Sequence, residues 1–134
     1  MREINKIIVH CSDSSSGRGD TAATIHDWHL QRAWDGIGYH YVILENGTVE
    51  NGRPEYWKGS HCFGANAKSI GICLIGIDEF TAMQFESLRA LICDLRDRYP
   101  GAAIAGHRDY DNRKTCPSFD VAAWWEKSRQ ERAQ

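Results

Sequence analysis

The segment Ile4-Asn-Lys-Ile-Ile-Val-His10 decides the fold, because it is a short β-branched run that ends at a histidine. A run of this kind predicts a buried strand over Ile4–Val9, with His10 directly after it. Similar apolar runs at Ile70–Ile75 and Ala102–Ala105 predict two further strands. A residue that directly follows a buried strand lies where side chains emerge at a sheet edge or cleft. His10 is therefore the first candidate functional residue.

The segments on either side of Glu45-Asn46-Gly47 predict a β-hairpin. Tyr39–Leu44 and Thr48–Glu50 are its two arms, and the Asn-Gly pair supplies the turn. Both residues of such a pair tolerate positive φ, which a tight hairpin turn requires. The hairpin adds an antiparallel pair to strands that are otherwise separated by helices, so the sheet is expected to be mixed.

Three helices are predicted, each starting at a polar residue that can cap its first turn. They run from Thr21 (with Thr21 or Asp20 as cap) to about Trp34, from Thr81 to Pro100-Gly101, and from Asp120 to about Arg129. Thr81 and Gln84 have the spacing of a capping box. In the first helix, Ile25, Trp28 and Ala33 are expected to share one face. The predicted fold class is α/β, a single domain with a central mixed β-sheet of about five strands flanked by helices.

Composition narrows the possible functions. The 134 residues have the length of one domain, with 42% hydrophobic and 25% charged residues. The formal net charge of −2 argues against binding that depends on broad attraction to DNA or to an anionic membrane. No run approaches the roughly 20 apolar residues of a membrane helix, and no signal peptide is recognised. The five cysteines are expected to be reduced thiols, some of them free to bind a metal.

His10, His107 and Cys116 are candidate metal ligands. His107 follows another short predicted strand, and Cys116 lies nine residues later, before Pro117. Two neutral imidazoles and one thiolate suit Zn²⁺, and three protein ligands leave open the fourth position that a catalytic zinc requires. Spacing alone does not distinguish this set from packed or solvated side chains. No His-Glu-x-x-His or Cys-x-x-Cys signature competes with it.

Tyr39 and Lys114 carry chemistry that would be useful beside a metal. Tyr39 opens a predicted strand, where its ordinary role is that of a half-buried aromatic side chain. Lys114 lies two residues before Cys116, in a loop where a lysine is usually solvated. Near a metal, a phenol can hydrogen-bond a bound water or a developing oxyanion. An ammonium group there can stabilise the negative charge of a tetrahedral intermediate.

Four ordered motifs give the chain a resemblance to a known family. They are IVHCS at 8–12, WDGIGYHYVILENGTVENGR at 34–53, GSHCFGANAKSIGICLIG at 59–76 and KTCPSFD at 114–120. Together they resemble the type 2 N-acetylmuramoyl-L-alanine amidases, in particular T-odd phage lysozyme-like endolysins, with peptidoglycan recognition proteins as more distant relatives. The resemblance spans Ile4 to about Trp125 and implies the type 2 amidase/peptidoglycan-recognition fold.

The resemblance also implies a role for each candidate residue. The implied zinc ligands are His10, His107 and Cys116, the implied catalytic residues are Tyr39 and Lys114, and His61 is placed at the substrate groove. His40 faces away from Tyr39 on an extended chain, which favours a structural role in the sheet. Cys11 points away from its neighbour His10 by the same alternation and is interpreted as a packed thiol. The segment Gly76-Ile77-Asp78-Glu79 lacks a second glycine that relatives often show, so a loop near the groove is expected to differ.

The implied activity is zinc-dependent hydrolysis of the amide bond between N-acetylmuramic acid and L-alanine in bacterial peptidoglycan, with one Zn²⁺ per chain. The resemblance implies a phage endolysin, with residues 1–134 forming a single zinc amidase domain that acts as a monomer. Such a protein is made in the host cytoplasm without a signal peptide. It acts on the cell wall after the membrane has been permeabilised.

Three alternative functions stay open at this point. The first is a non-catalytic peptidoglycan-binding module, although the joint presence of the three zinc ligands with Tyr39 and Lys114 argues against it. The second is a lysin that additionally binds and inhibits a phage RNA polymerase, which would depend on surface contacts. The third is a cytoplasmic recycling amidase for anhydro-muropeptides, which the tyrosine motif and the compact length disfavour.

Overall fold

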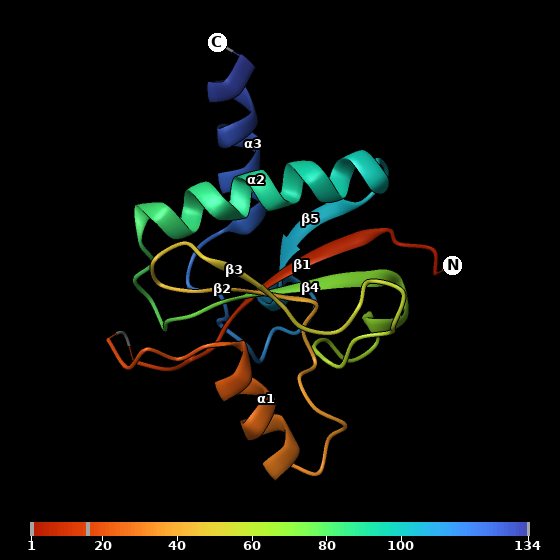
Figure 1. Cartoon of the computed structure of the whole chain (residues 1–134). Coiled ribbons are helices and arrows are strands. Elements are labelled where there is room, and N and C mark those ends of the chain that lie inside the picture. The colour runs from red at the N-terminus through yellow and green to blue at the C-terminus, as the bar shows by residue number, and fades with distance from the viewer. Residues whose placement is uncertain (1, 16, 134) are drawn as a thin grey trace.

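The computed structural model describes residues 2–15 and 17–133, so Met1, Ser16 and Gln134 of the predicted domain lie outside the described residues. Its strands and α-helices are β1 Lys6–Cys11, α1 Ala22–Gln31, β2 Tyr41–Ile43, β3 Val49–Asn51, β4 Ser69–Leu74, α2 Ala82–Arg98, β5 Ala103–Gly106 and α3 Val121–Ala133. The strands form one mixed sheet in the order β3-β2-β4-β1-β5. Helices α2 and α3 lie on one face of this sheet and α1 on the other (Figure 1). The predicted fold class is confirmed.

Strand β1 is one of the two inner strands in the parallel part of the sheet. It pairs with β4 on one side and β5 on the other, so that Ile7 lies between Ile70 and Ile104. All three side chains are at most 8% exposed. The predicted strand at Ile4–Val9 starts two residues later than expected and continues through His10. His10 is therefore the penultimate residue of the strand rather than the residue after it.

The hairpin and the long helix form where local sequence predicts them. β2 and β3 pair antiparallel around the Asn46-Gly47 turn, and Gly47 has the positive φ of 88° that this turn needs. At the start of α2, Gln84 N–H donates to Thr81 Oγ1 (3.1 Å) and Thr81 N–H donates to Gln84 Oε1 (2.9 Å), which confirms the capping box.

Helix α1 ends earlier than predicted. Its last residue is Gln31, and Ala33 adopts a positive φ of 64°. The Trp34 N–H then donates to the His29 carbonyl and the Ala33 N–H to the Leu30 carbonyl, the pattern of a Schellman C-cap. The prediction that the helix reaches Trp34 and places Ala33 on its buried face is wrong. An alanine in the usual glycine position gives no sequence signal for this stop.

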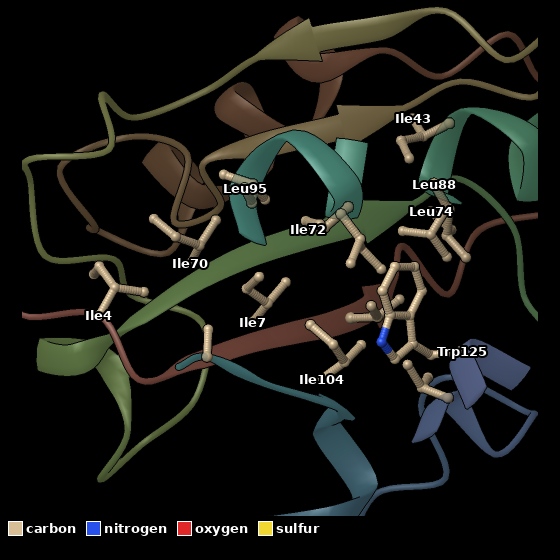
Figure 2. Close-up of a cluster of buried hydrophobic side chains, with 14 residues drawn as sticks. Ile4, Ile7, Ile43, Ile70, Ile72, Leu74, Leu88, Leu95, Ile104 and Trp125 are labelled. Carbon is tan, nitrogen blue, oxygen red and sulfur yellow. The ribbon is translucent and has the colours of Figure 1, made fainter. Parts of the chain in front are cut away.

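Strand β4 separates two different environments. Its Ile70, Ile72 and Leu74 point toward α2 and α3, where they join the main hydrophobic core (Figure 2). The intervening residues, Ser69, Gly71 and Cys73, point to the α1 face because side chains alternate along a strand. On the α1 face β4 therefore carries smaller side chains than on the face toward α2 and α3. None of the described helices is long and apolar enough to cross a membrane.

Candidate metal centre

The three predicted metal ligands lie together at one edge of the sheet. His10 is in β1, His107 directly follows β5, and Cys116 lies in the loop before α3. Because Val9 pairs with Gly106 in the parallel register, the next residues of both strands, His10 and His107, lie side by side. Their ring centroids are 4.4 Å apart. One ligand atom from each of the three residues lies within 4.8 Å of the other two.

Cys116 reaches the cluster because its loop is bonded across the sheet edge. Its carbonyl accepts from the Arg108 N–H at 2.9 Å, and its Sγ accepts from the Cys11 N–H at 2.8 Å. The next residue, Pro117, is buried against Gly106, where an added Cβ would come 3.0 Å from the proline ring. These contacts hold the sulfur beside the end of β1.

Cys11 differs in one respect from its prediction. It is buried, as expected of a packed thiol, but its backbone contacts the cluster: the Cys11 N–H donates to Cys116 Sγ at 2.8 Å, and the Cys11 carbonyl accepts from the Cys116 thiol at 3.6 Å. Strand alternation describes Cys11 relative to His10 correctly, but it cannot reveal that a loop from another part of the chain covers the strand end. The Cys11 N–H and carbonyl are contacts of the candidate centre that sequence reasoning missed.

The electrostatics of the two histidines favour metal binding. Burial lowers the pKa of His10 well below its usual value, and the neighbouring His61 and His107 lower it further. Burial also lowers the pKa of His107, with a smaller contribution from the charge of Lys114. Both imidazoles are therefore neutral at pH 7, which is the form that can donate a lone pair to a metal.

The thiol of Cys116 needs a cation to become a ligand. The Cys11 thiol and burial both raise the pKa of Cys116, whereas the Cys11 N–H lowers it. A bound divalent cation reverses this balance because a coordinating thiol loses its proton outright. The donor set of two neutral imidazoles and one thiol thus fits a borderline-soft metal ion better than a hard one.

Tyr39 lies beside the cluster, although not on the strand predicted for it. Strand β2 begins at Tyr41, so Tyr39 precedes the strand, with its carbonyl accepting from the Arg53 N–H at 2.9 Å. Its ring centroid is 5.1 Å from that of His10. Burial, followed by the thiols of Cys73 and Cys116, raises the pKa of Tyr39 well above its usual value. The phenol therefore keeps its proton at neutral pH and can act as a hydrogen-bond donor.

Lys114 is an exposed residue of the loop that carries Cys116. Its backbone N–H donates to the Asp111 carbonyl at 3.0 Å, which places it in a turn next to the loop segment that carries Cys116. The charge of Lys114 lowers the pKa of His107, so the ammonium group lies within electrostatic range of the cluster. The structure thus brings all five of the main predicted site residues to one edge of the sheet.

The remaining histidines of this face are bonded to protein atoms. His61 Nδ1 lies 2.8 Å from His10 Nε2, and His61 Nε2 lies 3.1 Å from Ser69 Oγ. His40 accepts from the Gly71 N–H through Nδ1 (3.0 Å), and its Nε2 lies 2.8 Å from the Trp57 carbonyl, which confirms its structural role in the sheet. The placement of His61 at a substrate groove stays a prediction.

A cavity of about 500 Å³ lies between α1 and the segment after β3. His26, Asp35, Arg53 and Trp57 are among its lining residues. Arg53 lines this cavity and also contacts Tyr39 beside the cluster. Its Nε donates to the Ile37 carbonyl at 2.7 Å, and its backbone N–H donates to the Tyr39 carbonyl. The candidate metal ligands themselves do not line the cavity. It is a hollow next to the centre rather than the centre itself.

Fold and site together define an α/β protein with a His-His-Cys cluster at the carboxyl edge of its parallel strands. Comparison with known proteins identifies the family. Residues 1–119 match the family described as N-acetylmuramoyl-L-alanine amidase. The endolysin of Escherichia phage T7 is 42% identical over 130 residues, which cover 91% of this chain and 85% of the phage protein.

Solved structures agree with this assignment. The N-acetylmuramoyl-L-alanine amidase LysC from Clostridium intestinale URNW has a TM-score of 0.85 and 32% identity, covering 97% of this chain and 87% of LysC. Drosophila PGRP-LB shares the fold with a TM-score of 0.75 and 24% identity, covering 95% of this chain and 80% of that protein. The chain belongs to the N-acetylmuramoyl-L-alanine amidase family and is an enzyme with this amidase activity.

Proposed function

We propose that this amidase is a zinc-dependent phage endolysin that cleaves the bond between N-acetylmuramic acid and L-alanine in bacterial peptidoglycan. The observation that carries the proposal is the convergence of His10, His107 and Cys116, with ligand atoms within 4.8 Å of one another. Two imidazoles and one thiol that converge in this way are donors that would suit Zn²⁺. The similarity to the T7 endolysin supports a role in degrading the cell wall of a phage host.

The residues around the cluster match the needs of amide hydrolysis. When bound, zinc supplies an acidified water and polarises the scissile carbonyl. His10, His107 and Cys116 would hold that ion. The ammonium group of Lys114, at the end of a flexible and exposed side chain, stabilises the negative charge that develops on the carbonyl oxygen. Tyr39 keeps its proton and donates a hydrogen bond that orients the attacking water or assists proton transfer. No side chain has to form a covalent intermediate.

The proposal includes one zinc per chain and a single domain that acts as a monomer. The five site residues come from β1, the β5 end, the segment before β2 and the loop before α3 of one chain, so no second copy is needed to complete the cluster. Peptidoglycan is the expected substrate, and the exposed Tyr56, Trp57 and Phe63 on the segment after β3 offer aromatic surface for sugar rings.

The test is a digestion of purified peptidoglycan in which new amino groups of L-alanine and new reducing sugar ends are both measured. We expect new amino groups without new reducing ends, loss of activity in a chelator, and recovery when zinc is restored. New reducing ends without new amino groups would identify a glycosidase and contradict the proposal. Metal content is measured in parallel, and a value well below one zinc per chain would contradict the zinc assignment.

A further inference from the structure

The contact between His10 and His61 has a consequence for the metal centre. His10 Nε2 and His61 Nδ1 are 2.8 Å apart, a hydrogen-bond distance, with the rings nearly perpendicular at 88°. His61 Nε2 continues the chain to Ser69 Oγ at 3.1 Å. His10 is only 1% exposed and Ser69 is fully buried, so water does not compete for these bonds from either end. The three side chains form a short hydrogen-bond relay whose two outer members are buried.

This relay can run in only two directions if all rings are neutral, because a neutral imidazole has one N–H and one lone pair. In one direction His10 Nε2–H donates to His61 Nδ1, and His61 Nε2–H donates to Ser69 Oγ. His10 Nδ1 then carries a free lone pair. In the other direction His61 Nδ1–H donates to His10 Nε2, which leaves a proton on His10 Nδ1. Only the first direction leaves His10 a lone pair for a metal, since its Nε2 is occupied by His61.

The fold holds His61 in the position from which it can make this contact. An added Cβ at Gly71 would lie 2.7 Å from the His61 ring, and one at Gly59 would lie 2.6 Å from it, so glycine is required at both places. The backbone of the segment is fixed as well, because the N–H groups of His61 and Cys62 both donate to Asn66 Oδ1, at 2.9 and 2.8 Å. The ring therefore lies over the β4 backbone, directed at His10.

We propose that His61 is a positioning residue of the metal centre: it accepts a hydrogen bond from His10 Nε2 and thereby fixes the His10 tautomer and ring orientation that present Nδ1 to the metal. This inference rests on the proposed zinc function and assigns His61 a role other than direct substrate contact. Ser69 is the outer member of the relay and fixes the tautomer of His61 in turn. Partners of metal-bound histidines act in this way in other metal sites.

The test measures zinc affinity by competition with a chromophoric chelator in full-length variants. His61→Ala and His61→Phe both remove the acceptor, and the phenylalanine retains a ring of similar shape. We expect either change to raise the zinc dissociation constant by roughly 10- to 100-fold. His61→Gln retains a side-chain carbonyl that can accept from His10, and it should recover most of the affinity. Ser69→Ala should have a smaller effect in the same direction.

His26→Gln is the matched control, because His26 is an exposed histidine that accepts a backbone N–H from Ile37 at 3.0 Å outside the relay. Its zinc affinity should equal that of the unmodified protein. An unmodified protein that binds no zinc would refute the proposed function itself. Unchanged zinc affinity in His61→Ala, in a protein that does bind zinc, would overturn only the positioning role. A raised KM for peptidoglycan together with unchanged zinc affinity would assign His61 to substrate binding instead.

Discussion

The two faces of strand β4 differ more than any neighbouring regions of the sheet. Toward α2 and α3 the strand presents Ile70, Ile72 and Leu74, all fully buried in one hydrophobic cluster. Toward α1 it presents Ser69, Gly71 and Cys73, and each of these lies next to a residue of the candidate metal centre or its neighbours. The difference shows that the two faces of one strand can have different roles. Alternate residues of β4 stabilise the hydrophobic core on one side, and the residues between them leave space for polar side chains on the other.

The largest expected effect is a loss of amidase activity on mutation of the candidate metal centre. Cys116→Ala removes the thiolate ligand, so we expect zinc content to fall and amidase activity to drop by about 10³-fold or more, since a catalytic metal contributes several kcal/mol. The free energy of unfolding of the metal-free protein should change little, because Cys116 is only partly buried in a loop. Metal analysis, the peptidoglycan assay and urea unfolding check this together. Retention of full zinc content and activity would show that the ligand assignment is wrong.

Substitutions on the face toward α2 and α3 should change the free energy of unfolding and not the amidase activity. Leu88→Ala removes a fully buried side chain of α2 from the main cluster, which should lower the free energy of unfolding by about 3 kcal/mol. Activity per folded molecule should stay the same. Met83→Ala, at a position on α2 that is 53% exposed, is the control and should cost less than about 0.5 kcal/mol. A Leu88→Ala protein that is stable but inactive would break the distinction between the two faces.

Lys114 tests whether charge beside the cluster contributes to chemistry. Lys114→Ala should lower kcat by roughly 100-fold through loss of oxyanion stabilisation, with zinc content and unfolding free energy nearly unchanged. Lys114→Arg retains the charge and should lose less activity. Lys127→Ala, an exposed lysine of α3, is the control. Equal activity of Lys114→Ala and the unmodified enzyme would remove Lys114 from the catalytic residues.

Acid should lower the free energy of unfolding through buried histidines on the α1 side of the sheet. Burial lowers the pKa of both His29 and His40 to about 4, below the value of roughly 6.5 in an unfolded chain. Above pH 6.5 both states are neutral and stability is full. As the pH falls from 6.5 toward 4, the unfolded state takes up protons first, so each histidine removes up to about 1.4 kcal/mol per pH unit. Urea unfolding of metal-free protein between pH 7 and 5 measures this loss.

A variant isolates the contribution of one histidine to that acid sensitivity. His40→Gln replaces the titratable ring with an amide, so its unfolding free energy should depend less steeply on pH over the same interval. An equally steep dependence in His40→Gln would show that other groups account for the loss. An unfolding free energy that does not change between pH 7 and 5 in the unmodified protein would contradict the conclusion that these buried rings are neutral.

The smallest effects are expected at the helix caps, one on each side of the sheet. Thr81→Ala removes the side-chain acceptor at the start of α2, and Thr21→Ala does the same for α1. Each should lower the free energy of unfolding by about 1 kcal/mol. Thr81→Ala should leave zinc affinity unchanged, because α2 covers the apolar face. Thermal unfolding and chelator competition on the two variants provide the comparison, and a loss of zinc affinity in Thr81→Ala would couple the faces.

Much of the fold was predictable from short-range signals. The Asn46-Gly47 turn, the Thr81–Gln84 capping box and the apolar strand runs all depend on residues within a few positions of one another. The end of α1 was missed because Ala33 takes a conformation that usually requires glycine. The start of β2 at Tyr41 instead of Tyr39 was also missed, since the strand register of β2 with both β3 and β4 starts at Tyr41.

The sequence by itself determined the kinds of elements, the composition of the two strand faces and, through four motifs, the identity of the candidate ligands. Only the tertiary structure decided that His10, His61 and Ser69 form one relay, that Cys11 contacts Cys116 at a sequence separation of 105, and that Tyr39 lies beside His10. The reason is physical: caps, turns and alternation are set by local geometry. Contacts between distant segments depend on strand order and register, which arise only when the whole core packs.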